Sequence, residues 1–293
     1  MNVNINALNR VFTKQVINSL VENDDNTKII LENIIKQYLS DMHFKKNVDI
    51  ITRIYLYMSK NYRNEYFYIN TLLNKLLLGR HSLSTTTAIT QLPIASSKAD
   101  FILLNGKAVV YEVKTELDTF GRLEYQLNDY YKAFTYVNVI TCESNYFKLN
   151  KMLKDTPTGI CVLSEKNTIR TKKEAQCSSD HLDKQVIFKI LRKYEFENMI
   201  MNFYKKLPQA TPAFYYDECF KLFEKIPLDS LYSSFIRQIK NRNKVLDLNS
   251  FNSVPYELKS YAYFSNLKGS EYHKIFNFLN RNYKEEPECI IHM

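Results

Sequence analysis

The fold is decided by residues 98–114, which read KADFILLNGKAVVYEVK. Apolar, β-branched and aromatic residues, which strands favour, dominate this stretch, and Asn105-Gly106 near its centre is a strong hairpin turn signal. The stretch therefore predicts a β-hairpin. Charged residues interrupt both arms: Asp100 lies on the first arm, and Glu112 and Lys114 lie on the second. Because such charges are costly to bury without a partner or a metal, we expect them to form a divalent-metal site for phosphodiester hydrolysis.

The register of this hairpin decides whether the charged residues meet. A two-residue turn at Asn105-Gly106 would place Asp100 opposite Tyr111, which points to the wrong face because side chains alternate along a strand. A shared site requires Asp100 on the same face as Glu112 and Lys114. We therefore expect a three-residue turn with the glycine in the left-handed conformation, or a bulge in one arm.

The residues that follow the hairpin predict a helix from 120 to 134, because apolar or aromatic residues recur there at helical spacing. Asp118 or Thr119 is expected to cap its N-terminus. Side chains spaced at i, i+4 and i+8 share one face of this helix, namely Arg122, Gln126 and Tyr130. A further strand is predicted directly afterwards, from 137 to 142.

Together these elements resemble the PD-(D/E)XK nuclease superfamily, which has the restriction-endonuclease-like fold. The resemblance rests on Asp100, on Glu112-Val113-Lys114 and on the Gln126-x-x-x-Tyr130 helix. The Gln-x-x-x-Tyr element is similar to the RecB-like branch of the superfamily. More narrowly, the sequence resembles a bacterial family of uncharacterised nuclease-like proteins. The resemblance covers about residues 62–165, roughly a third of the chain.

The resemblance implies an α/β fold whose core is a mixed sheet. Its elements are a helix, a three-stranded meander, a second helix and another strand, flanked by N- and C-terminal helical regions. The sequence offers a first helix at 65–78 and a first strand at 86–95 in front of the hairpin. Related proteins often carry a further acid on the first helix, and Glu65 is the nearest candidate, although it stands at the start of that helix.

The resemblance also implies a role for each site residue. The implied catalytic residues are Asp100, Glu112, Lys114, Gln126 and Tyr130. Asp100 and Glu112 would bind Mg²⁺ or Mn²⁺ together with the carbonyl of Val113, and Lys114 would assist the attacking water. The Gln/Tyr pair of the helix would orient the lysine or the nucleic-acid backbone. The implied function is hydrolysis of DNA in restriction, phage defence or repair, and a homodimer is a further expectation because restriction-like nucleases dimerise to cut both strands.

Simpler explanations are open for each part of this motif. An exposed salt bridge at a sheet edge would also place an acid and a lysine here, and such bridges contribute little. Gln126 alone is compatible with a solvated polar face, and Tyr130 with the apolar stripe of the helix. A protein of the same fold that binds nucleic acid, or that only contacts another protein, would need no cleavage at all.

The net charge of +9 and the pI of about 9.1 favour a polyanionic partner such as nucleic acid, and we expect DNA. An AT-rich coding sequence would supply lysines without such a partner, so the charge permits this interpretation and does not establish it. The residues predicted to contact phosphates are Arg122, Arg237, Lys240 and Arg242. The alternative for the last three is a solvated helix end, where cations are favourable.

The chain divides by pattern into a helical region at 1–61, an α/β core at 62–180 and a second helical region at 181–293. With 45% hydrophobic residues it can bury a sizeable core. Its five cysteines lack Cys-x-x-Cys spacing, which argues against a zinc finger or a disulfide framework. Since neither a leader nor an apolar run of about 18 residues is visible, we expect a cytoplasmic protein without a membrane partner.

Overall fold

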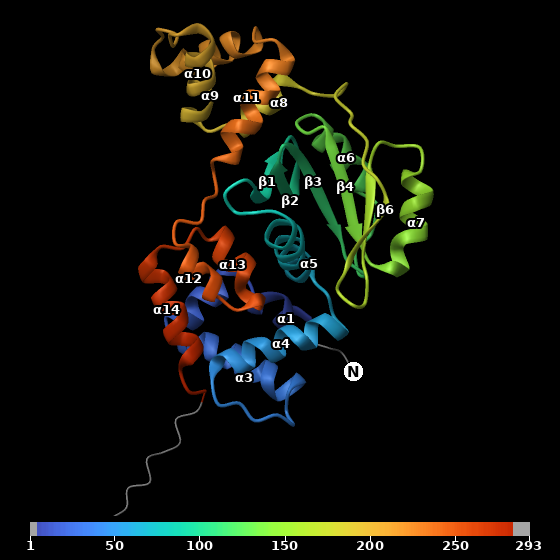
Figure 1. The fold of residues 1–293 in the computed structure, drawn as a ribbon, viewed down its shortest axis with the longest axis vertical. Coiled ribbons are helices and arrows are strands. Elements are labelled where there is room, and N and C mark those ends of the chain that lie inside the picture. The colour runs from blue at the N-terminus through green and yellow to red at the C-terminus, as the bar shows by residue number, and fades with distance from the viewer. Residues whose placement is uncertain (1–4, 284–293) are drawn as a thin grey trace, which may run out of the picture. The chain divides into compact units, whose positions relative to one another are not determined.

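The sheet that contains the hairpin has six strands in the computed structural model, which describes residues 5–283 (Figure 1). The strands lie in chain order, as β1 (Thr87–Ile94), β2 (Ser97–Asn105), β3 (Lys107–Lys114), β4 (Tyr136–Thr141), β5 (Gly159–Leu163) and β6 (Ile169–Lys173). The first three form an antiparallel meander, β3, β4 and β5 are parallel, and β6 is antiparallel to β5. This mixed sheet with flanking helices confirms the predicted α/β class.

The β2–β3 hairpin has the turn that a shared site requires. Its last pair joins Asn105 to Lys107 across Gly106, so the turn spans three residues. The φ of Gly106 is +67°, in the left-handed region that glycine adopts without a steric penalty. The same register, extended by one residue beyond the last recorded pair, places Asp100 opposite Glu112 and therefore on the same face. The expected three-residue turn with a left-handed glycine is confirmed.

Helix α6 (Leu123–Tyr131) covers the face of the sheet to which the charged residues point (Figure 1). Its buried Leu127 packs in one apolar cluster with Ile102 of β2, Val110 of β3 and Phe134. Side chains alternate between the two faces along a strand, so Ile102 and Val110 point to the same face as the site residues. The candidate site is therefore the polar end of an otherwise apolar layer between the sheet and α6.

The start of α6 differs from the prediction. The helix begins at Leu123, and the capping position is held by Arg122, whose side chain makes no capping hydrogen bond. Asp118 is not a cap. Its carboxylate Oδ2 instead accepts from the N–H and the hydroxyl of Thr115, each at 2.7 Å, and so stabilises the turn that leaves β3.

Further helices follow the meander within the same part of the chain. They are α7 (Glu143–Leu153), α8 (Lys184–Ile190), α9 (Lys193–Tyr204), α10 (Pro212–Glu224) and α11 (Leu228–Lys240). The ring of Phe188 on α8 lies within 5.2 Å, centre to centre, of the rings of Phe196, Phe220 and Phe223. Phe220 packs against the apolar cluster of the sheet, and the other three belong to it. The helices that follow residue 181 are thus packed on the sheet and share its core.

Contacts divide the chain into two compact units. The first joins the residues up to Asn74 to those from Val245 onward, and the second is continuous from Lys75 to Lys244. These units follow packing, whereas the predicted regions 1–61, 62–180 and 181–293 follow the change from helical to strand pattern. The largest difference concerns α8–α11, which the pattern groups with the C-terminal helices and the packing groups with the sheet.

The first unit is helical. Its elements are α1 (Ile5–Val11), α2 (Lys14–Val21), α3 (Asp25–Tyr38), α4 (Asn47–Asn61), α5 (Glu65–Leu72), α12 (Leu248–Ser253), η2 (Tyr256–Leu258), α13 (Lys259–Phe264) and α14 (Gly269–Asn280), and the π-helical η1 (Leu73–Leu78) continues α5. Buried Asn70 ties its two sequence segments together, because its amide donates to the Tyr55 hydroxyl at 2.9 Å and to the Tyr256 carbonyl at 3.0 Å. No helix among the described residues is both long and apolar enough to cross a membrane.

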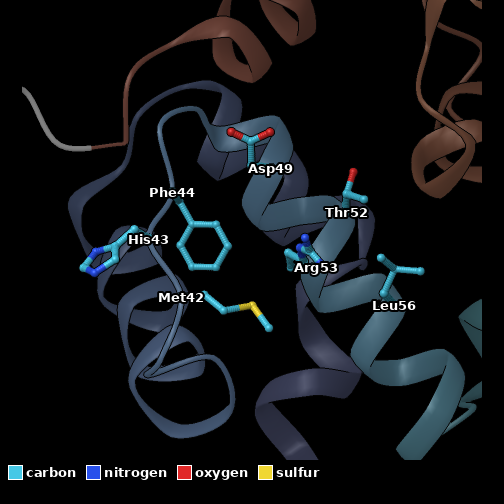
Figure 2. Close-up of a pocket in the computed structure, with 7 residues that line it drawn as sticks. All are labelled: Met42, His43, Phe44, Asp49, Thr52, Arg53 and Leu56. Carbon is cyan, nitrogen blue, oxygen red and sulfur yellow. The ribbon is translucent and has the colours of Figure 1, made fainter.

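A cleft of about 540 Å³ lies in the first unit, between α4 and the segment at residues 42–44 (Figure 2). Arg53 and Asp49 reach it from α4, and Phe44 faces them from the segment. Its lining residues include none of the residues predicted to form a nuclease site, all of which belong to the second unit.

Candidate active site

The candidate site lies where β2 and β3 separate. Backbone pairing of the two strands ends at Phe101 and Tyr111. Beyond this point the N–H of Val113 donates to Oδ2 of Asp100 at 2.8 Å, so a carboxylate takes the position that a main-chain carbonyl holds in a continued ladder. Asp100 is half-buried. The fork therefore brings a charged side chain between two strands of an apolar sheet.

Asp100 also meets Gln91, a residue that the sequence pattern did not indicate. The Gln91 amide nitrogen lies 3.4 Å from Asp100 Oδ1. Its φ is +53°, although it stands inside β1 between Thr90 and Leu92, which both pair with β2. A left-handed non-glycine residue within a strand is strained, and such strain gathers at functional sites. No local signal marks Gln91, because its neighbours have an ordinary strand composition.

Glu112 and Lys114 project from β3 to the same face and form a buried ion pair. Their side chains are 1% and 11% exposed, and Lys114 Nζ lies 2.8 Å from Glu112 Oε1. The same ammonium donates to Oε1 of Gln126 on α6 at 2.9 Å. The structure thus brings the predicted acid, base and amide together, from a strand and a helix that are separated in sequence by an irregular connection.

Tyr130 completes this network from the next turn of α6. Its hydroxyl lies 2.6 Å from Glu112 Oε2 and 2.9 Å from the carbonyl oxygen of Lys98. Burial first, and then the negative charges of Glu112 and Asp100, raise the pKa of Tyr130. The hydroxyl therefore stays protonated and acts as a donor, and both carboxylate oxygens of Glu112 are hydrogen-bonded by protein groups.

Asp129 fixes α6 against the meander. Its Oδ2 accepts from the N–H of Ser96 at 3.1 Å and from the hydroxyl of Ser97 at 2.8 Å, both at the β1–β2 turn, while Lys132 Nζ lies 2.7 Å from Oδ1. Burial acts to raise the pKa of Asp129, but the hydrogen bonds from Lys132, Ser97 and Ser96 and the charge of Lys132 outweigh it and lower the pKa. An ionised Asp129 thus holds the helix that carries Gln126.

Oxygen donors at the fork are the carboxylates of Asp100 and Glu112 and the main-chain carbonyl of Val113. Residues 5–283 contain no group of three or more His, Cys, Asp and Glu side chains placed to hold a metal, so these two carboxylates have no third acidic neighbour of that kind. Glu65, the candidate acid of the first helix, is exposed at the start of α5 and belongs to the first unit. Lys114 pairs with Glu112, and Asp100 supplies a second carboxylate on the same face.

The residues predicted to contact phosphates have different surroundings. Arg122 is exposed at the start of α6, Arg237 is exposed on α11, and Lys240 is half-buried at the end of that helix. The hydrogen bonds to Asp100 and Glu112 at the fork come from Gln91, Val113, Lys114 and Tyr130. The three basic residues line the surface of the second unit, as a phosphate-binding role requires.

Arg242 is a correction to the prediction. Its side chain is 7% exposed and faces Glu195, which is 0% exposed, with Nε donating to Oε1 at 2.7 Å and the terminal nitrogen also donating to the Ile190 carbonyl at 2.8 Å. Burial acts to raise the pKa of Glu195, but hydrogen bonds from Arg242 and from the Arg192 N–H, with the charges of both arginines, lower it. A guanidinium held in this way cannot contact a phosphate backbone.

The comparisons with known proteins give one family and no individual relative. No curated protein and no solved structure matches the chain significantly. A family model described as bacteriophage P4 protein cII matches residues 58–255, about two thirds of the chain, and this range contains the whole sheet and the fork of β2 and β3. The chain belongs to the bacteriophage P4 protein cII family.

Proposed function

We propose that this protein is a Mg²⁺-dependent nuclease that hydrolyses the phosphodiester bonds of DNA. The observation that carries the proposal is the linked set at the fork, in which Lys114 bonds Glu112 and Gln126 while Tyr130 bonds Glu112. Charged groups inside an apolar layer are costly to bury, and networks of this kind concentrate at functional sites. A restriction-endonuclease-like arrangement of the sheet and α6 accounts for each member of the set.

The donor set fits a hard divalent cation. Asp100 and Glu112 stand on neighbouring strands on one face, and the Val113 carbonyl supplies a neutral oxygen, which together are the ligand types that Mg²⁺ and Mn²⁺ prefer. When bound, the ion lowers the pKa of a water molecule and polarises the phosphate.

The remaining residues hold the reacting groups in position and balance the charge that develops on them. The ammonium of Lys114 stabilises negative charge that develops on the phosphoryl oxygens, and Gln126 holds that ammonium in place through its amide oxygen. The hydroxyl of Tyr130, which its raised pKa keeps protonated, fixes the orientation of the Glu112 carboxylate. The half-buried Asp100 is the more accessible of the two acids, since Glu112 is buried.

The setting of this activity is bacterial. The matching family is named for a bacteriophage protein, and this supports a role in the interaction of phages with their bacterial hosts. We place the proposed nuclease in restriction, in phage defence or in repair of DNA, in the bacterial cytoplasm. The excess of positive charge over the whole chain supports a nucleic-acid substrate.

Incubation of the purified protein with supercoiled plasmid and with linear DNA tests the proposal. Cleavage is expected with Mg²⁺ or Mn²⁺ and none with EDTA. Asp100→Asn and Glu112→Gln keep the shape of the side chains but remove the negative charges, so each should abolish cleavage. Glu124→Gln on α6 is the matched control, because that carboxylate is exposed and outside the hydrogen-bonded network. Full activity of Glu112→Gln, or cleavage that persists in EDTA, contradicts the assignment.

One observation favours a second function. Glu112 is 1% exposed and both its oxygens are already hydrogen-bonded, to Lys114 and to Tyr130, so a cation has to share or displace these donors. A protein that keeps the nuclease fold but only binds nucleic acid or another protein is compatible with such a closed network. The same assay separates the two functions, since binding without cleavage under every metal condition supports the second.

A further inference from the structure

Large exposed aromatic residues stand at the start of the two helices that follow the parallel strands. Tyr125 on α6 is 75% exposed, and Phe147 on α7 is 80% exposed. Single exposed apolar residues are common on protein surfaces, so exposure alone carries no function. These two differ because each lies close in sequence to a basic residue, Arg122 or Lys148, and on a helix that follows a strand of the sheet that carries the candidate site.

The starts of α6 and α7 meet at one edge of the sheet. β3 and β4 are parallel, so the helices that follow them both begin at the carboxyl ends of these strands (Figure 1). Two contacts join the segments: the Asn145 amide donates to the Thr115 carbonyl at 3.0 Å, and Lys148 Nζ lies 5.0 Å from the centre of the Phe120 ring. Thr115 directly follows Lys114, so the first of these contacts lies at the end of the strand that carries Glu112 and Lys114.

Aromatic rings and cations alternate on this surface. The rings of Tyr146 and Phe147 are 5.5 Å apart, and Lys172 Nζ of β6 lies 5.4 Å from the Tyr146 ring and 3.9 Å from Glu143 Oε2 of α7. Arg122 holds the capping position of α6 three residues before Tyr125, and both side chains are exposed at this end of the helix. We call the set the stacking surface, and its members are Arg122, Tyr125, Tyr146, Phe147, Lys148 and Lys172.

We propose that the stacking surface binds the unpaired bases of a single-stranded nucleic acid, which makes single strands the substrate class of the proposed nuclease and so rests on that function. Aromatic side chains stack on any base whose face is open, whereas in a duplex neighbouring base pairs cover those faces. The interleaved cations follow a phosphate backbone. A protein partner fits this composition poorly, because lysine is depleted at the centre of protein–protein interfaces.

Binding measured without cleavage tests this inference directly. The full-length protein in EDTA is titrated into fluorescein-labelled 20-nucleotide probes: a single-stranded DNA, an RNA of the same sequence and the DNA duplex. Combined Tyr125→Ala and Phe147→Ala should weaken binding of the single strand at least about tenfold, since each stacked base contributes roughly 1–3 kcal/mol. Duplex affinity should change less than about twofold. Comparison of the single-stranded DNA and RNA probes shows which of the two nucleic acids binds more tightly.

Two matched variants separate stacking from general effects. Combined Tyr194→Ala and Phe214→Ala removes aromatic side chains that are 51% and 65% exposed on α9 and α10, and it should leave single-strand binding unchanged. Combined Arg122→Gln and Lys148→Gln should instead flatten the salt dependence of single-strand binding by about 1.4 units of slope, roughly 0.7 for each lost phosphate contact. An unchanged slope contradicts the inference.

The possible outcomes distinguish failure of the stacking surface from failure of the proposed nuclease activity. Cleavage of single and double strands at equal rates, unaffected by Tyr125→Ala with Phe147→Ala, overturns the stacking surface and leaves the nuclease standing. Tight, aromatic-dependent binding of single strands by a protein that never cleaves supports the stacking surface and overturns the nuclease. No binding of any probe overturns the stacking surface and leaves a protein partner as the occupant of these residues.

Discussion

Two buried glutamates of the second unit, Glu195 and Glu112, differ in the partners that surround them. Glu195 faces Arg242, its side chain is completely buried, and the pair is closed by the Arg192 N–H and the Ile190 carbonyl. Glu112 faces a lysine, and that lysine also serves Gln126 and lies at a fork with a second carboxylate, Asp100. In the first cluster one carboxylate is stabilised by hydrogen bonds from Arg242 and the Arg192 N–H and by the charges of both arginines. In the second, one lysine serves both Glu112 and Gln126, and a further carboxylate lies on the neighbouring strand.

The comparison shows how a structural ion pair differs from a candidate functional one. A planar guanidinium and a carboxylate satisfy each other in two parallel hydrogen bonds, which leaves little capacity for a further ligand. An ammonium has three donors and no fixed plane, so the cluster of Lys114 and Glu112 accommodates a change of partner. We therefore expect the Glu195 cluster to govern stability and the Glu112 cluster to govern chemistry.

The largest effect is expected from Arg242→Ala. Removing one partner of a buried pair leaves an uncompensated charge, which costs about 3–5 kcal/mol of the free energy of unfolding. Urea unfolding followed by circular dichroism measures this loss, and Arg237→Ala, at an exposed position on α11, should cost less than about 0.5 kcal/mol. Cleavage per folded molecule should stay unchanged. A loss below about 1 kcal/mol would remove the structural role that we assign to the Glu195 pair.

Lys114→Ala should act on rate and leave metal affinity in place. Loss of one charge that stabilises the transition state lowers the cleavage rate about 10²–10³-fold, while Asp100 and Glu112 still hold the ion. Mn²⁺ titration and cleavage kinetics measure the two quantities separately. Lys107→Ala is the matched control, because this exposed lysine belongs to the same strand, where it lies over the Tyr136 ring. Equal cleavage rates for Lys114→Ala and Lys107→Ala would mean that the Lys114–Glu112 pair is structural, like the Arg242–Glu195 pair.

A smaller effect should appear in the dependence of stability on pH. The pKa of Glu195 is lowered in the folded protein, so its ionised form stabilises the fold above the unfolded pKa, about 4.3. This contribution is lost as the pH falls through the lower folded value. The difference in unfolding free energy between the wild type and Glu195→Gln should therefore be constant from pH 7 to about pH 5.5 and shrink below about pH 4. A difference that does not vary with pH would mean that the Arg242 pair does not depend on ionised Glu195.

Local sequence pattern was sufficient for the fold around the fork. Alternating strand composition and an Asn-Gly turn defined the hairpin, and the requirement that Asp100 and Glu112 share a face led to the three-residue turn that Gly106 makes. The spacing of Gln126 and Tyr130 placed both on the side of α6 that meets β3. Each of these features depends on residues close in sequence, where period and turn chemistry are informative.

Features set by distant residues were not predictable in the same way. The pattern from 184 to 207 reads as one helix, but α8 ends at Ile190 and α9 begins at Lys193, where Glu195 caps the Arg192 N–H and binds Arg242, 47 residues away in sequence. Periodicity carries no information about such a partner. The left-handed backbone of Gln91 is likewise found only in the structure, where its amide lies 3.4 Å from Asp100 Oδ1.

The division of the chain has a consequence for the order of folding. The second unit is continuous from Lys75 to Lys244, whereas the first is completed only by residues after Val245. During synthesis the sheet unit therefore emerges as a whole before α12, α13 and α14 emerge, and domains fold as units while the chain emerges. The first unit must wait and then join segments separated by 170 or more residues, such as Asn70 and Ser260, a contact of high sequence separation that slows assembly. A released chain that ends at Lys244 would thus hold a complete sheet unit and an unfinished first unit.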